Sequence, residues 1–217
     1  MASVASLEEA LARVGLNEIF RVAGVAAVAQ LMNFELKFYN AGAALLSENA
    51  VFVAVMMEEL APLAQLDVRA AYAPGLLRSA GKVALDATAQ RDLRYVRPSP
   101  PTAETQIRTW ETEVFVLTNS GVAEALLRKW QIPFDVYVPI RDHYQDGLAV
   151  ASLPAAELLH LAASAALAHG LGLIGESSYW AKITPALLAK HGLDEAQCSD
   201  ISARTYARFE RMKTALG

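Results

Sequence analysis

The chain has 217 residues, of which 54% are hydrophobic and 19% are charged, and its formal net charge at pH 7 is −4. This length fits one large domain or two small ones with a substantial core, and the acidic balance excludes the basic surface that nucleic-acid binding requires. The low charged fraction indicates that part of the surface is covered by a protein partner or by another copy of the chain.

The cysteine content and the N-terminal residues predict a cytoplasmic protein. Cys198 is the only cysteine, so a disulfide framework is excluded and a reducing compartment is indicated. Residues 1–20 carry three glutamates and lack the basic start of a secretory signal. The uncharged run 22–34 is too short to span a bilayer. We therefore expect no membrane span.

The first third of the chain has the pattern of a helical hairpin. Ser6-Leu-Glu-Glu9 is a capping box that starts a short helix. A second helix is expected from about Asn17 to Ser47, because apolar residues recur there at helical spacing. Ser47-Glu-Asn49 resembles a tight turn into a third helix, which Pro62 should end or kink. Residues 19–61 are thus predicted to form two antiparallel helices.

The middle of the chain is divided by prolines. Pro74-Gly75 is expected to break a helix, and another helical segment should cover about 76–95. Arg97-Pro-Ser-Pro-Pro101 predicts an extended connection. Thr102 is then expected to cap a helix, but residues 114–118 are rich enough in β-branched side chains to form a strand instead.

The remaining elements are also mostly helical. A helix is expected over about 122–130, whereas 132–140 alternates apolar and polar residues and is compatible with one short edge strand. Pro154 opens a long helix, because proline suits a first helical turn. Thr184-Pro185 should start another one that Gly192 ends, and a last helix begins near Asp194 or Ser199.

These patterns together predict a single all-α domain over residues 1–217. We expect a compact bundle of about seven to nine helices, with the short strand near 132–140 left open and the proline-rich connection at 97–101. The expected strand content is too low for a doubly wound sheet.

The longest uncharged apolar stretch runs from Leu158 to Gly175 and ends in the pattern Gly170-x-Gly-x-x-Gly175. Three interpretations compete: a buried core helix, a helix that carries metal ligands, and the glycine turn of a dinucleotide-binding fold. The glycine turn requires a buried strand before the first glycine, whereas the alanine-rich residues 161–168 favour a helix. We therefore expect a buried helix whose end is marked by glycines.

Glu157 and His160 lie at the start of this stretch, and their spacing of three places them on one face of a helix. This is half of the carboxylate-bridged di-metal motif of helical bundles, but the second Glu-x-x-His is missing. A standard di-iron site is therefore not expected. The usual alternative is a core histidine that is simply hydrogen-bonded.

A polar cluster, Arg141-Asp-His-Tyr-Gln-Asp146, precedes this helix. His143 with Asp142 or Asp146 can form an acid/base pair, because a carboxylate fixes the tautomer of the ring and raises its basicity. His143 could also converge with Glu157 and His160, and the three would then be ligands for one non-haem metal ion such as iron. Polar residues in a connection more often form a solvated turn.

Two functions remain open from the sequence. The first is a small-molecule enzyme with an internal apolar pocket, in which His143 and Asp146 are catalytic and His143, Glu157 and His160 bind the metal. Its chemistry would be metal-dependent oxidation or acid/base catalysis on a small apolar ligand. The second is a non-catalytic helical subunit, such as a scaffold, an adaptor or a chaperone, which self-associates or binds a protein partner.

Overall fold

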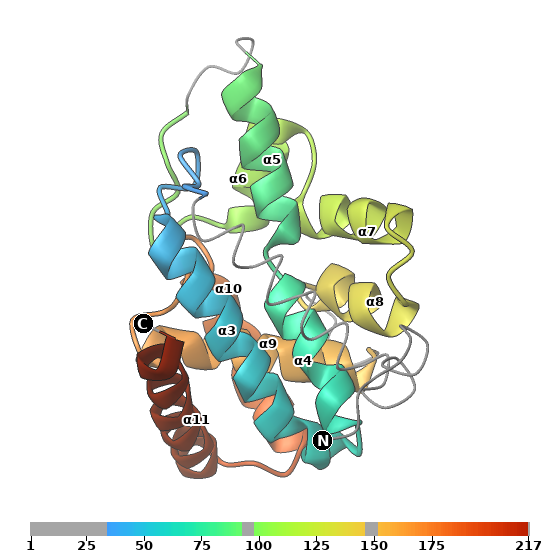
Figure 1. Ribbon diagram of the computed structural model, residues 1–217, viewed down its shortest axis with the longest axis vertical. Helices are drawn as coiled ribbons and strands as arrows, with labels where there is room; N and C mark the ends of the chain where they lie inside the picture. The colour runs from blue at the N-terminus through green and yellow to red at the C-terminus, as the bar shows by residue number, and fades with distance from the viewer. Residues whose placement is uncertain (1–33, 93–97, 146–151, 217) are drawn as a thin grey trace, which may run out of the picture.

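The computed structural model describes residues 34–92, 98–145 and 152–216 (Figure 1). In these residues the regular structure is helical, apart from one isolated antiparallel bridge between Leu36 and Ala41. The predicted all-α class is confirmed. The elements are α3 (Ala43–Leu60), the 3-10 helix η1 (Ala61–Ala64), α4 (Val68–Leu77), α5 (Ala80–Arg91), α6 (Ile107–Phe115), α7 (Asn119–Lys129), α8 (Phe134–Asp142), α9 (Pro154–Ala168), α10 (Ser177–Lys190) and α11 (Glu195–Leu216).

Helices α3 and α9 form the centre of the molecule. α3 packs against α4, α9 and α11, and α9 also packs against α8 and α10. In Figure 1, α3 runs through the middle of the view, with α4 on one side and α11 on the other. Both central helices are buried on nearly every side, which explains why their sequences are apolar all round rather than amphipathic.

A smaller group of helices extends from this centre. α5 packs against α7, and α7 packs against α8, which returns the chain to α4 and α9. Figure 1 shows α5, α6 and α7 at the upper end of the molecule. The proline-rich residues 98–101 approach this group without regular structure, in agreement with the expected extended connection. The assignment of one domain to residues 1–217 stays a prediction.

The predicted hairpin over 19–61 is wrong in its described part, and the expectations for residues 1–33 lie outside the described residues. A tight turn occupies Leu36–Ala41, where Asn40 adopts a left-handed conformation with φ of 52°. α3 begins only at Ala43, so Ser47 and Asn49 are buried inside a helix instead of forming a turn. The expected effect of Pro62 is confirmed, since α3 ends just before it.

Helix α4 continues through Pro74-Gly75, so the predicted break there is wrong. A β-carbon on Gly75 would lie 2.5 Å from the Cα atom of Ala54 in α3. The glycine therefore permits close packing of the two helices, and the chain breaks later, at Arg78 and Ser79.

The short strand near 132–140 is also not formed, because these residues enter helix α8. Val136 and Ile140, four residues apart, are both buried on one face of this helix. The alternation that favoured a strand is equally compatible with that helical spacing. The open question at 114–118 is answered as well: α6 ends at Phe115, and Val116 adopts a left-handed conformation with φ of 63°.

The apolar stretch that begins at Leu158 is a core helix, as predicted. α9 begins at Pro154 and ends at Ala168, and Gly170 follows with φ of 70°. The glycine pattern therefore marks a helix end. No helix in the described part of the chain is both long and apolar enough to cross a membrane.

The last two helices differ from expectation in one boundary. α10 begins at Ser177, so Pro185 lies inside this helix and does not start it. Gly192, with φ of 67°, follows its end as predicted. α11 then begins at Glu195, where the carboxylate of Asp194 accepts a hydrogen bond from the backbone N–H of Gln197 at 2.7 Å.

Candidate functional site

His143 caps the C-terminus of α8 and is fully buried. Its Nδ1 atom lies 2.8 Å from the carbonyl oxygen of Ile140. Because a carbonyl can only accept, Nδ1 carries the proton and Nε2 is left as an unprotonated acceptor. Nε2 has no hydrogen-bond partner among the described residues. Burial, and then the positive charge of Arg78, hold the pKa of His143 well below its usual range, so the ring is neutral at pH 7.

His160 lies in α9 and contacts His143 through the main chain. Its Nδ1 atom donates to the carbonyl oxygen of His143 at 3.1 Å, and its Nε2 atom lies 3.2 Å from Oγ1 of Thr184 in α10. Burial lowers the pKa of His160 to about 4. The structure therefore brings the two predicted histidines together, but His160 uses both of its nitrogens for contacts with neighbouring elements, and His143 uses Nδ1 for a contact with its own helix.

Glu157 lies one turn before His160 but reaches the end of α10. Its two carboxylate oxygens accept hydrogen bonds from Lys190 Nζ and His191 Nε2, each at 2.8 Å, and Oε1 also accepts one from Ser152. Burial raises the pKa of Glu157, but the hydrogen bond from Lys190 and the other donors outweigh it, so the pKa is lowered. Glu157 is thus an ionised carboxylate that joins the start of α9 to the end of α10.

The predicted metal ligands do not form a ligand set in this structure. Across the described residues, no three His, Cys, Asp or Glu side chains lie close enough together to hold one ion. Asp146, the predicted acid/base partner of His143, lies outside the described residues. The other candidate partner, Asp142, accepts two hydrogen bonds from Arg141, at 2.7 and 2.8 Å, and one from Gln145.

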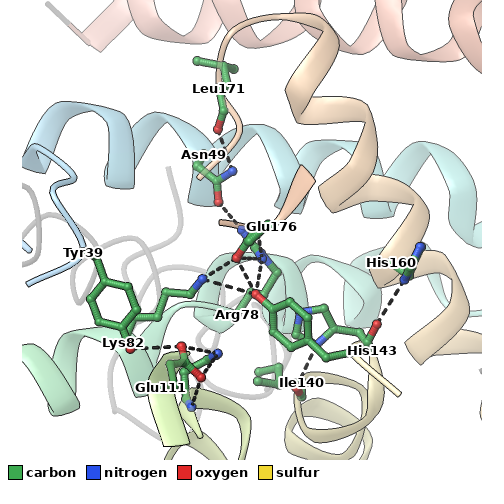
Figure 2. Close-up of polar contacts among 12 residues, drawn as sticks. Tyr39, Asn49, Arg78, Lys82, Glu111, Ile140, His143, His160, Leu171 and Glu176 are labelled. Atoms are coloured by element: carbon green, nitrogen blue, oxygen red, sulfur yellow. Dashed lines mark hydrogen bonds and ion pairs between the residues drawn. The ribbon is translucent and has the colours of Figure 1, made fainter. Parts of the chain in front are cut away.

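The densest group of buried polar side chains lies beside His143 and was not predicted from the sequence. It consists of Asn49, Arg78, Lys82, Tyr144 and Glu176, which we call the charged core (Figure 2). Each side chain comes from a different segment: α3, the α4–α5 junction, α5, the residues after α8, and the residue before α10. All five are at most 1% exposed.

Glu176 is the centre of the charged core. Nη1 of Arg78 lies 3.0 and 3.1 Å from its two carboxylate oxygens, and both Lys82 and the Tyr144 hydroxyl donate to Oε1. Burial alone would raise the pKa of Glu176, but Arg78 and Lys82 outweigh it and lower the pKa to about 2. Burial and Glu176 together raise the pKa of Tyr144 well above its usual range, so the phenol keeps its proton.

Asn49 links the charged core to the loop after α9. Its Oδ1 atom accepts from Arg78 Nη2 at 2.7 Å, and its Nδ2 atom donates to the carbonyl oxygen of Leu171 at 2.7 Å. This contact explains why a polar residue lies inside the apolar helix α3. It also holds the glycine-containing loop, which the sequence pattern had suggested for nucleotide binding, against the helical core.

A second buried carboxylate, Glu111 in α6, adjoins Lys82. It accepts hydrogen bonds from the Tyr39 hydroxyl at 3.0 Å and from the backbone N–H and the amide of Asn119 at 2.8 Å. Burial raises its pKa, against the lowering effect of Lys82 and these donors. The two buried cations, Arg78 and Lys82, are therefore faced by two buried carboxylates, Glu176 and Glu111. Such compensation is what burial of charge requires.

The charged core has the properties of a structural junction. Its side chains bond to one another, and almost all of their polar atoms are satisfied, with Nε of Arg78 as the exception. No local spacing could have revealed it, because Arg78 and Glu176 are 98 residues apart. The available signal was weaker: Glu176 is a single charge that follows a long uncharged stretch.

Comparisons with known proteins match the sequence to one family and the fold to one solved structure. Residues 1–146 match the family model described as HDOD domain. A solved structure from Marinobacter aquaeolei VT8, provisionally assigned to signal transduction, is similar with a TM-score of 0.67 and 19% sequence identity. That similarity covers 99% of this chain and 48% of the other, so the chain spans about half the length of that protein. No curated protein matches.

Proposed function

The chain belongs to the HDOD domain family, and we propose on this basis that it is a non-catalytic helical module that acts in signal transduction by binding a protein partner. The family is related to HD phosphohydrolases, so the competing function is a hydrolytic or other metal-dependent enzyme. The structural similarity to a protein assigned to signal transduction supports the first function at the level of the fold.

The observation that carries this proposal is the use of the candidate catalytic groups as structural links. Glu157 accepts from Lys190 and His191, and His160 donates to the main chain of His143. A general base or a metal ligand needs a free lone pair that faces substrate or an ion. Nε2 of His143 has a free lone pair, but the whole side chain is buried.

The surface supplies a candidate contact area for the partner. Trp130 and Phe134, at the junction of α7 and α8, are 57% and 66% exposed. Tryptophan is enriched among the residues that contribute most to binding at protein interfaces. We call this pair the aromatic corner. The proposed partner is a second copy of the chain, in line with its low charged fraction.

Sedimentation velocity on the purified chain tests the partner. We expect a dimer at micromolar concentration, and a monomer for the double variant Trp130→Ser/Phe134→Ser. The matched control is Leu63→Ser/Val68→Ser, which removes two other exposed apolar side chains (38% and 42% exposed) at η1 and the start of α4. A wild-type chain that stays monomeric, or a control that dissociates as readily as the aromatic variant, contradicts the proposed contact.

Metal analysis and hydrolysis assays test the competing enzyme. The purified chain is assayed on p-nitrophenyl phosphate and bis(p-nitrophenyl) phosphate with Mg²⁺, Mn²⁺ or Fe²⁺, beside His143→Ala and His160→Ala. We expect substoichiometric metal and no turnover that either substitution changes. Stoichiometric iron that is lost in either variant, or turnover that disappears with His143, would establish the enzyme and contradict the proposal. The predicted iron site and the cytoplasmic location stay predictions.

A further inference from the structure

A cavity of about 500 Å³ lies between α9, α10 and α11. Its volume falls in the range of roughly 300–1,000 Å³ that is usual for small-molecule sites. The lining residues all lie between 164 and 203, beyond residues 1–146 that match the family model. None of the predicted catalytic or metal-binding residues that the structure describes is among them. The cavity therefore adjoins His160 through Thr184 and Trp180 without including it, and the aromatic corner is not part of its lining.

The cavity is lined mostly by apolar side chains. Leu167, Pro185 and Leu188 contribute aliphatic groups, and Trp180 adjoins them although only 1% of its surface is exposed. Small alanine side chains from all three helices form much of the remaining wall: Ala165, Ala168, Ala181 and Ala203. A wall made mostly of aliphatic groups favours an apolar ligand.

The lining offers no positive charge that could bind an anionic ligand. Among the lining residues there is no lysine or arginine, and the one carboxylate, Glu195, is exposed. Burial lowers the pKa of His169 and raises the pKa of Cys198, so both groups are neutral at pH 7. A carboxylate or phosphate ligand would lose its hydration without gaining a cation.

Two hydroxyl groups of the lining, those of Ser164 and Ser177, have the same polarity. Ser164 donates its proton to the carbonyl oxygen of Leu161, and Ser177 donates to that of Ala103, each at 2.8 Å. A hydroxyl that has donated its single proton keeps only lone pairs for a ligand. These two hydroxyls therefore act as hydrogen-bond acceptors toward the cavity.

We propose that this cavity binds a neutral apolar molecule that carries a hydrogen-bond donor, such as a phenol or an alcohol. The apolar body packs on the aliphatic wall, and the donor bonds the hydroxyl of Ser164 or Ser177. This site does not depend on the proposal of partner binding.

Three probes of the same size test the ligand class. β-Naphthol has an aromatic ring and a donor, naphthalene has the ring alone, and β-naphthoate has the ring with a negative charge. We expect β-naphthol to bind about threefold to tenfold more tightly than naphthalene, the difference that one hydrogen bond usually makes. β-Naphthoate should bind more weakly than both. Equal affinities of β-naphthol and naphthalene, or preferred binding of β-naphthoate, overturn the proposed chemistry.

A matched pair of variants tests the location. Ala203 lines the cavity and is exposed, so Ala203→Phe fills the space without disturbing the core. Ala207 is exposed one turn further along α11 and is not a lining residue, so Ala207→Phe is the control. We expect Ala203→Phe to weaken β-naphthol binding about tenfold or more and Ala207→Phe to leave it unchanged. Equal effects of the two variants, or no binding of any probe at millimolar concentration, overturn the site.

The single cysteine supplies an independent readout. Cys198 lines the cavity and is partly exposed, so a thiol reagent can be followed without other labelled positions. β-Naphthol should slow the reaction of Cys198 with Ellman's reagent in the wild-type chain and in Ala207→Phe. It should not slow the reaction in Ala203→Phe. Protection that persists in Ala203→Phe would place the probe elsewhere and contradict the proposal.

Discussion

The charged core and the mostly apolar cavity differ in how the hydrogen-bonding capacity of their polar groups is used. In the charged core, Glu176, Arg78, Lys82 and Tyr144 bond to one another and are at most 1% exposed. In the cavity, the hydroxyls of Ser164 and Ser177 donate their protons to backbone carbonyl oxygens and keep lone pairs for a ligand. We infer that the first arrangement stabilises the fold and that the second is available to a ligand.

Trp180 connects the two regions. Its ring stacks on Tyr144 with a centroid distance of 5.2 Å, and the guanidinium of Arg78 lies 6.0 Å from its centroid. The same side chain lines the cavity. The comparison therefore predicts different losses of stability for substitutions on the two sides of Trp180. Substitutions in the charged core should cause large losses, and substitutions in the cavity lining should cause small ones.

The largest effect is expected from Glu176→Gln. This substitution leaves Arg78 and Lys82 without their shared carboxylate, and the loss of one partner from a buried ion pair costs about 3–5 kcal/mol. Urea unfolding monitored by circular dichroism measures the change in the free energy of unfolding. Glu195→Gln, an exposed carboxylate at the cavity, is the control and should change it by less than about 0.5 kcal/mol.

A second substitution sharpens this test. Lys82→Met in the Glu176→Gln background removes one of the uncompensated cations, so part of the lost stability should return. If the double variant is as unstable as the sum of two separate losses, the charges of the core are not coupled. Such a result would contradict the claim that the side chains of the charged core stabilise the fold by bonding to one another.

Acid is expected to destabilise the protein through His160. Its pKa falls from 6.5 in the unfolded chain to about 4 in the fold. The folded protein therefore holds this proton less tightly, and stability that is present above pH 6.5 is lost as the pH falls toward 4. The shift corresponds to about 3 kcal/mol. The lowered pKa of His143 acts in the same direction.

Urea unfolding at several values between pH 7 and pH 4 tests this dependence. The wild-type chain should lose stability throughout the interval, and His160→Gln should lose less, because its amide does not titrate there. Below about pH 4.5 both proteins should lose further stability, because the unfolded chain protonates Glu176 there whereas the fold lowers its pKa to about 2. Parallel curves for the two proteins between pH 7 and pH 4 would show that His160 does not contribute.

Local features of the fold were predictable from the sequence. The start of α9 at Pro154 and its end before Gly170 follow from conformational preferences of those residues alone. Pro185 misled for the same reason, because a proline that suits a first turn is also tolerated within α10. The boundary was decided by packing, which single residues do not encode.

The candidate site was predictable only in part, because its contacts are long-range. The sequence identified His143 and His160 as neighbours, and they do meet, but through the backbone carbonyl of His143. Glu157 and His160 share a helix, yet Glu157 pairs with His191, a residue 34 positions away that the spacing argument never considered. A spacing of three residues places two side chains on the same face of a helix, but it does not determine which residues they contact.

A smaller effect is expected at the boundary of the cavity. Ser202 is 5% exposed, and its hydroxyl lies 2.8 Å from Nε2 of His169. Ser202→Ala removes this hydrogen bond, whose net contribution should be about 1 kcal/mol, because His169 is only partly buried and water can replace the hydroxyl. Urea unfolding beside Ser199→Ala, an exposed lining residue, measures it. A loss comparable to that of Glu176→Gln would mean that the cavity wall is as essential to the fold as the charged core.

The smallest effect is expected from Ala203→Phe. The alanine is exposed and faces open space, so the larger side chain displaces no buried atoms and should change the free energy of unfolding by less than about 0.5 kcal/mol. The same variant is expected to weaken binding of β-naphthol. Equilibrium unfolding and probe titration on one protein sample separate the two quantities. Lost binding with unchanged stability distinguishes a site for a ligand from a gap in packing, because a packing gap that is filled would stabilise the protein.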